Sequence, residues 1–149
     1  GFEKGNIFAY DCRQPNSIQI LSEINELKND SIVNIVGNRN GSNLMYACSK
    51  KGNTLIWNGV TNKTRIIRNP PNQDKHIISF DIHSYLPFLL YSDATESPHM
   101  NRYDGTTLCR FNDIPPKCPL TSHPSEPLIS FINPSTELLQ IYQINSFCA

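Results

Sequence analysis

The amino-acid sequence is organised by a repeat, and this repeat limits the folds open to the chain more than any other feature does. Four short apolar segments each end in an aromatic residue beside a polar or turn residue. Successive aromatics lie 47, 46 and 39 positions apart: Tyr10, Trp57, Tyr103 and Tyr142. A period of about 40–45 residues is typical of chains that repeat one four-stranded sheet. Because such a sheet cannot bury its apolar faces alone, the repeat predicts several sheets packed on one another.

A second set of markers gives a similar period. His83 and Pro87 recur as His123 and Pro127, each displaced by 40 positions. A short apolar run follows the proline in both copies. Two independent markers therefore indicate the same repeating unit.

Short strands separated by turn residues account for the sequence between the markers, which is an all-β pattern. Only residues 22–30 could hold a helical turn, and their charges favour a surface loop. The predicted strands cover 6–11, then 31–36, 43–49 and 53–57, then 76–83, 87–92 and 100–103, then 120–123, 127–132 and 138–144, with outer strands at 17–21, 64–68 and 107–111.

These strands predict an all-β fold, a β-propeller of which the chain supplies about three blades plus the last strand of a preceding one. The units span approximately residues 1–16, 17–62, 63–106 and 107–149. Closed propellers usually have ~4–8 blades, so upstream sequence or a partner chain is expected to complete the ring. We therefore expect the chain to be the C-terminal part of a larger protein.

Charge and hydropathy argue against two classes of partner. Thirteen basic residues balance thirteen acidic ones, so no overall field draws the chain to nucleic acid or to an anionic membrane. The longest apolar stretches, 77–82 and 88–91, are far shorter than the ~20 residues of a membrane-spanning helix. We expect protein partners, no nucleic acid and no transmembrane segment.

The cysteines are scattered without the Cys-x-x-Cys spacing of a zinc site or a redox motif. Five are present, an odd number: Cys12, Cys48, Cys109, Cys118 and Cys148. We interpret them as reduced, mostly structural thiols of a cytosolic protein.

Residues that could support catalysis follow the repeat. His83 and His123 occupy equivalent places in different units, which favours structural histidines over a metal site. The aspartates fall at turns and strand ends: Asp11, Asp81, Asp93, Asp104 and Asp113. No GxSxG, HExxH, Walker loop or GxGxxG motif is present. The recurring aromatics fit packing between blades better than ligand stacking. We predict no catalytic residues, no bound metal and no cofactor.

Two polar groups of residues remain. A run of basic side chains interrupted by apolar ones is interpreted as a solvated face: Lys50, Lys51, Lys63, Arg65, Arg68 and Lys75. The other is the cluster Tyr10-Asp11-Cys12-Arg13, in which Arg13 lies just beyond a predicted third strand and projects from the rim of a blade. Asp11 and Arg13 are our candidate partner-binding residues, with Arg13 placed to pair with a partner carboxylate.

The repeat units resemble those of WD-repeat proteins, since Tyr10-Asp11 and Tyr103-Asp104 approach the Trp-Asp dipeptide. A closer resemblance is to the C-terminal propeller of the Raptor family, the scaffold subunits of TOR complex one. The similar segments occur in the family's order: 5–13 with its Asp-x-Arg, 51–57, 78–83 and 123–129. The chain departs from the family at Ser84, where a Pro would stand, at Asn58, which replaces Asp, and at 132–135, which replace a Gly-Ser-Asn turn.

The resemblance implies a non-catalytic cytoplasmic scaffold that recruits substrates to a TOR-type protein kinase beside a small propeller subunit. Its partners would place it at the lysosomal or vacuolar membrane surface. An alternative class is a substrate receptor of a cullin-type ubiquitin ligase, because Tyr10-Asp11-Cys12-Arg13 is similar to the Trp-Asp-x-Arg box that contacts the ligase adaptor. A propeller enzyme with acidic residues in its channel is a third class.

Overall fold

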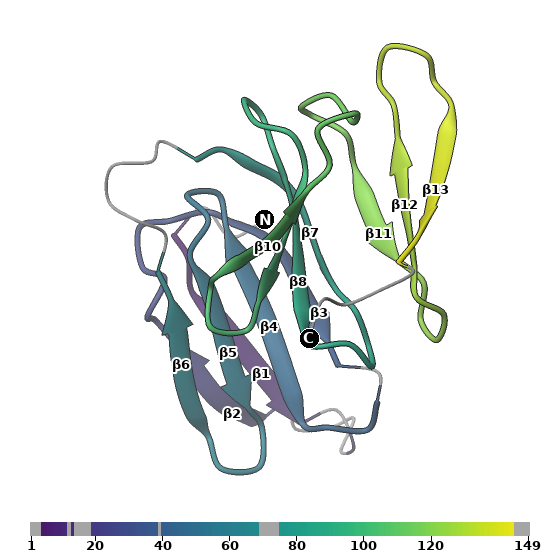
Figure 1. The fold of residues 1–149 in the computed structure, drawn as a ribbon. Coiled ribbons are helices and arrows are strands. Elements are labelled where there is room, and N and C mark those ends of the chain that lie inside the picture. Colours follow the sequence, from purple (N-terminus) through teal and green to yellow (C-terminus); the bar gives the residue numbers. More distant parts are fainter. Residues whose placement is uncertain (1–3, 12, 14–18, 39, 69–74, 145–149) are drawn as a thin grey trace.

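A computed structural model describes residues 4–11, 13, 19–38, 40–68 and 75–144. All regular structure in this part of the chain is antiparallel β-sheet, arranged as four sheets that lie side by side in chain order (Figure 1). No helix able to cross a membrane occurs among these residues.

Each sheet is a meander in which neighbours in sequence are neighbours in space. The first sheet holds β1 (Ile7–Asp11) and β2 (Gln19–Ile24); the second β3 (Ile32–Gly37), β4 (Leu44–Ser49), β5 (Thr54–Asn58) and β6 (Lys63–Ile67); the third β7 (Ile77–Ile82), β8 (Phe88–Asp93), β9 (His99–Arg102) and β10 (Thr107–Arg110); the fourth β11 (Leu120–Ser122), β12 (Leu128–Ile132) and β13 (Leu139–Gln143). Every predicted strand is present, with small shifts at its ends. The surface loop expected within 22–30 is shorter than predicted, because β2 extends to Ile24 and a turn follows it.

The repeat unit of the sequence and the sheet of the structure are offset by one strand. The unit 17–62 begins with β2, the outer strand of the first sheet, and ends with β5, the third strand of the second sheet. The same relation holds in 63–106, which begins with β6 and ends with β9. Each unit therefore contributes strands to two sheets.

Strand β8 shows why the sheets pack on one another. All six of its residues are buried, because the strand lies between two neighbouring sheets and its side chains alternate between them. Leu89 and Tyr91 join the core shared with the second sheet, whereas Phe88 and Leu90 join the core shared with the fourth. Burial on both faces explains the uninterrupted apolar run Phe88–Tyr91 in the sequence.

Three separate cores lie between successive pairs of sheets. Tyr46 and Cys48 of β4 belong to the core between the second and third sheets, while Ala47 belongs to the core between the first and second. Burial raises the pKa of the Cys48 thiol to about 12, as expected for a structural cysteine. Cys48, Cys109 and Cys118 are free thiols.

Hydrogen bonds between their first strands join the second sheet to the third and the third sheet to the fourth. Asn34 Nδ2 of β3 donates to the Phe80 carbonyl of β7 at 2.9 Å, and Ser79 Oγ of β7 donates to the Leu120 carbonyl of β11 at 3.1 Å. Asp81 Oδ2 accepts from Thr121 and Ser122 of β11. The inner strands are therefore joined by polar contacts that supplement the apolar cores.

Candidate protein-binding surfaces

The repeated histidines are turn caps. His83 Nδ1 accepts from the main-chain N–H groups of Tyr85 and Leu86, both at 3.2 Å. His123 Nδ1 accepts in the same way from residues two and three positions further on. Because Nδ1 of His83 accepts, its Nε2 donates to the Glu126 carbonyl of the next sheet at 2.8 Å. The prediction of structural histidines is confirmed.

Three of the four recurring aromatics pack against the cores between sheets, as the sequence predicts, whereas Tyr10 at the end of β1 is half exposed and contacts Phe8 of its own strand. Trp57 packs in the core between the first and second sheets. Tyr103 contacts Tyr46 of the preceding sheet, with ring centroids 5.5 Å apart. Tyr142 lies edge-on to Phe131 at 5.5 Å and packs with the residues shared by the third and fourth sheets.

The candidate pair Asp11 and Arg13 lies at the end of β1. Asp11 is the last residue of this strand and pairs with Gln19 of β2, but its side chain and Cys12 are outside the described residues. Arg13 is exposed just beyond the strand, and Tyr10 before it is 51% exposed. Partner binding by Asp11 and Arg13 stays a prediction.

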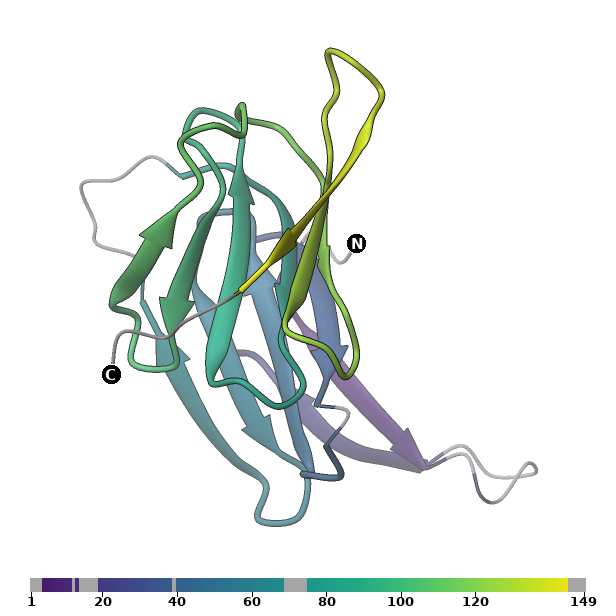
Figure 2. The same ribbon diagram turned by 45° about the vertical axis from the view of Figure 1, so that its right-hand side comes forward.

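The fourth sheet presents an open edge, a feature that we did not predict. In the second and third sheets a fourth strand, β6 or β10, covers the third. In the fourth sheet β13 pairs with β12 alone, and within the described ranges no strand covers its other side (Figure 2). Its unpaired N–H and C=O groups form a template to which another strand can be added.

The same sheet exposes an apolar face. Leu139 and Ile141 of β13 are 61% and 64% exposed, and Ile132 of β12 is half exposed. Leu139 lies opposite Ile132, and Ile141 lies opposite Ser130, so these side chains share one face. A groove of about 310 Å³ runs along it, with Leu128 and Ile129 in its lining. Exposed apolar patches of this kind mark surfaces that other protein segments cover.

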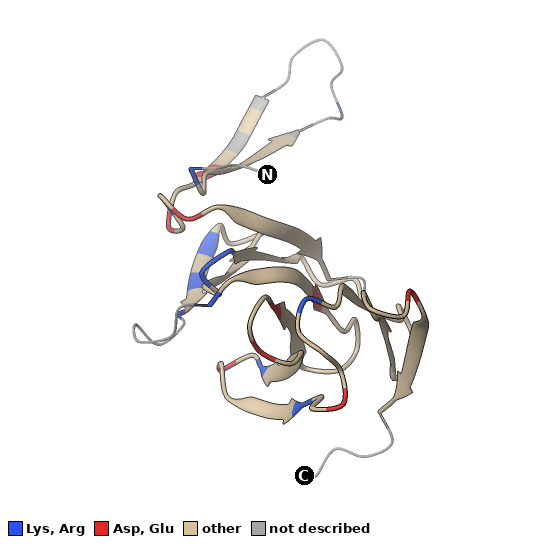
Figure 3. Ribbon diagram, turned by 90° about the horizontal axis from the view of Figure 1, so that it is seen from above, with Lys and Arg blue, Asp and Glu red and all other residues tan. Residues whose placement is uncertain are grey.

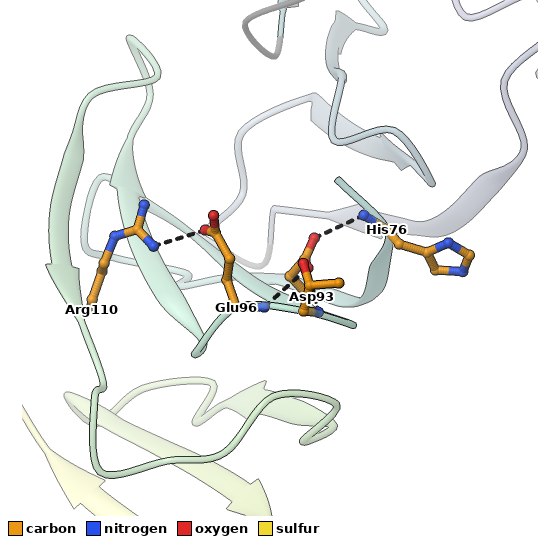
Figure 4. A network of polar contacts seen from close by, with 5 residues as sticks. His76, Asp93, Glu96 and Arg110 are labelled. Atoms are coloured by element: carbon orange, nitrogen blue, oxygen red, sulfur yellow. Dashed lines mark hydrogen bonds and ion pairs between the residues drawn. The ribbon is translucent and has the colours of Figure 1, made fainter. Parts of the chain in front are cut away.

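A buried carboxylate organises one end of the third sheet (Figure 4). Asp93 closes β8 and is fully buried; its Oδ2 accepts from the His76 main-chain N–H at 2.8 Å. Its Oδ1 accepts from the main-chain N–H and hydroxyl of Thr95 and from the Glu96 N–H. Burial opposes the charged form, but these hydrogen bonds outweigh it and hold the pKa of Asp93 below its usual value. The His76 ring points away from the carboxylate.

The basic residues are more than a solvated face. Lys63 and Arg65 are exposed on β6, the strand with two blue patches in Figure 3. Arg68 and Lys75, however, line a pocket of about 130 Å³ between the second and third sheets, together with Arg110 of β10. We did not predict a role for Arg110, or for the two polar residues of β9 that also line this pocket, His99 and Asn101. The sequence signal that could have found the pocket is a basic residue at the end of each outer strand: Arg68 follows β6, and Arg110 ends β10.

His99 is held neutral in this pocket. It is 1% exposed, and its ring stacks on Tyr91 with centroids 5.2 Å apart. Burial, followed by the nearby cations Lys75 and Arg110, lowers the pKa of His99 to about 4, although Glu96 acts in the opposite direction. The folded protein therefore resists protonation of this imidazole across the mildly acidic range.

Replacing His99 with phenylalanine is expected to reduce the acid sensitivity of the fold. Well above pH 6.5 His99 is neutral in both states, but as the pH falls through 6.5 toward about 4 the unfolded chain takes up this proton and the folded protein does not. The wild-type protein should lose about 2–3 kcal/mol of unfolding free energy from this group over that range. Denaturant unfolding of both proteins at pH 7.5 and 4.5 measures the difference, since Asp93 titrates equally in each. Identical losses of unfolding free energy in the wild-type protein and in His99→Phe would contradict the lowered pKa of His99.

Within the described residues no cluster of three or more His, Cys, Asp or Glu side chains could hold a metal ion. The sites that the structure does bring together are the open edge and apolar face of the fourth sheet, and the polar pocket between the second and third. Both are candidate sites for contact with another molecule.

No protein-family model matches the sequence, and no curated protein matches it. Solved structures do match. Raptor from Chaetomium thermophilum is 14% identical with a TM-score of 0.78, over 98% of this chain and 14% of Raptor. The C-terminal WD40 domain of Sif2 is 12% identical with a TM-score of 0.70, over 97% of this chain and 41% of that one. The WD40 repeats of RRP9 are 13% identical with a TM-score of 0.55, over 76% of this chain and 39% of that one.

The sheets, their meander order and their shared cores are those of WD-repeat propeller blades, and the chain forms part of such a propeller. These matches, at 12–14% identity, show the fold of the chain. Raptor is one particular protein that the chain resembles over nearly its whole length. The chain spans less than half of each of the three matched structures.

Proposed function

We propose that this chain is a non-catalytic part of a Raptor-like scaffold, which recruits substrates to the protein kinase of TOR complex one in the cytoplasm. The observation that carries the proposal is the superposition on Raptor over 98% of the chain. The ordered segments 5–13, 51–57, 78–83 and 123–129, which resemble the Raptor family, support it independently.

The open fourth sheet fits a scaffold that continues beyond these blades. An added strand on β13 would bury Leu139 and Ile141, and a further blade would cover the exposed apolar face. Burying apolar surface contributes about 25 cal/mol per Å², so both contacts would be favourable. Further blades of the same polypeptide or a partner chain would supply these elements.

Affinity purification of the full-length endogenous protein tests the proposal. A large lipid-kinase-like protein kinase and a small propeller subunit are expected to co-purify at native stoichiometry. A cullin and its adaptor without that kinase would overturn the TOR assignment and favour the ubiquitin-ligase alternative.

Arg13→Ala separates these outcomes further. Under the ligase alternative, Arg13 contacts the adaptor, and its loss should weaken adaptor capture severalfold. Arg102→Ala is the matched control, because Arg102 is also exposed at the end of a third strand.

A further inference from the structure

The pocket between the second and third sheets has the composition of an anion site. Arg68 follows β6, Lys75 precedes β7, and Arg110 ends β10, so three chain segments bring three cations to one cavity of about 130 Å³. Arg110 pairs with Glu96 at 2.8 Å. Neither Arg68 nor Lys75 forms an ion pair with another described residue. Among the residues that the structure describes, cations therefore outnumber the carboxylates that face the pocket.

Two buried polar side chains in the lining each have one polar atom without a hydrogen-bond partner among the described residues. His99 and Asn101 lie two positions apart on β9, so they share one face of the strand. His99 Nδ1 and Asn101 Oδ1 are buried without a hydrogen-bond partner in the described structure. Buried polar atoms nearly always have such a partner. A polar group entering the pocket would satisfy them, and the Asn101 amide can present either its oxygen or its nitrogen.

The size of the pocket limits what can enter it. Cavities that enclose a whole small-molecule ligand usually measure about 300–1,000 Å³. This pocket is smaller, so it fits one side-chain-sized group presented by a larger partner. A phosphate group suits three converging cations better than a carboxylate does, because it carries up to two charges and three free oxygens. A protonated phosphate oxygen can also donate to His99 Nδ1.

A phosphorylated protein segment suits this site better than a membrane does. Lipid-binding sites that can be recognised in a sequence usually contain a cluster of about 4–8 Lys or Arg residues. Here the cations number three, one of them is paired, and the chain as a whole is neutral. The protein-binding scaffold fold points to the same class of partner.

We propose that this pocket binds a phosphoserine or phosphothreonine side chain of a partner protein, with Arg68, Lys75 and Arg110 contacting the phosphate and His99 and Asn101 completing the site. The proposal rests on the protein-binding function and adds a phosphorylation-dependent contact to it. Binding would therefore be controlled by a kinase acting on the partner.

The test uses the full-length protein and a peptide library built around a fixed phosphoserine, with the same library bearing serine as its control. We expect binding of the phosphorylated library alone. Lys75→Gln should weaken it about tenfold, which corresponds to ~1.4 kcal/mol. Lys63→Gln, on the exposed face of β6 and outside the pocket, should leave it unchanged. If Lys75→Gln unfolds the protein, Arg68→Gln takes its place in the test, because Arg68 is exposed and also lines the pocket.

Three results would overturn the proposal: equal binding of both libraries, equal losses with Lys75→Gln and Lys63→Gln, or binding only to phosphatidylcholine vesicles carrying phosphatidylserine. The last would assign the pocket to a membrane. The complex is also purified from cells that express Lys75→Gln, so that phosphopeptide binding and recovery of the kinase are measured separately. Failure to recover the kinase with wild-type protein refutes only the TOR assignment, whereas loss of phosphopeptide binding in Lys75→Gln supports the pocket in either case.

Discussion

Replacing Gly5 with alanine is expected to cost more than about 4 kcal/mol of unfolding free energy, a loss at the upper end for single substitutions. Gly5 has φ +71°, and a Cβ there would lie 1.8 Å from the Leu27 carbonyl oxygen and 2.7 Å from that of Asp30. Both obstacles are main-chain atoms, so the turn before β3 would have to move. Its movement would open the core that contains Ile7 and Ile24.

Gly41→Ala is the matched control for this prediction. Gly41 also has a positive φ, +81°, but nothing lies within 4 Å of the Cβ position. The control therefore carries only the left-handed backbone cost of about 1–2 kcal/mol. Chemical denaturation of the full-length variants measures both losses. Similar losses at the two positions would show that Gly5 is not in close contact with the 27–30 turn.

Asp93→Ala is expected to cost about 3–5 kcal/mol, comparable to breaking a buried ion pair. The substitution removes a buried acceptor and leaves the main-chain N–H groups of His76, Thr95 and Glu96 without the oxygens that they donate to. Asp93→Asn retains one acceptor oxygen and should lose roughly half as much. Because the pKa of Asp93 is lowered, its contribution is fully present at neutral pH and is lost as the pH falls below the ordinary carboxyl range.

Asp104→Ala provides the comparison for Asp93. Asp104 accepts from the main-chain N–H and the hydroxyl of Thr106 at 2.8 and 2.7 Å, the same local arrangement that joins Asp93 to Thr95. Asp104 is exposed, so water replaces the lost acceptor and little stability should be lost. Thermal unfolding of the three variants ranks them. A loss for Asp104→Ala as large as that for Asp93→Ala would contradict the role of burial.

The sequence predicts the strands well because each depends on local properties. Turn residues and apolar alternation mark the ends of the strands, and the repeat confirms each assignment in another unit. The structural role of His83 was also predictable, since His123 repeats its spacing. The burial of Asp93 was not, because Asp93 and Asp104 both occur as aspartates followed two positions later by a threonine, and only packing distinguishes them.

The pocket could not be predicted for a related reason. Arg68 and Lys75 are visible as members of a basic run, but Arg110 is distant in sequence and reaches the cavity only because β10 is the outer strand of the third sheet. His99 and Asn101 resemble other polar residues of short strands. The pocket that they line also takes residues from the second sheet, three of whose strands belong to a different repeat unit. The open edge of β13 likewise appears only once the strands are paired.

The offset of one strand between repeat and sheet has a consequence for how chains of this kind can grow and shrink. Duplicating the unit 63–106 would insert one outer strand followed by three inner ones. The inserted outer strand would complete the second sheet, and the displaced β6 would complete the new one, so every interior sheet would keep four strands. Cutting the chain at a unit boundary instead divides a sheet, as a cut after residue 62 would leave β5 without β6. Gene duplication therefore preserves the pairing that truncation destroys, and fragments for expression should end after an outer strand.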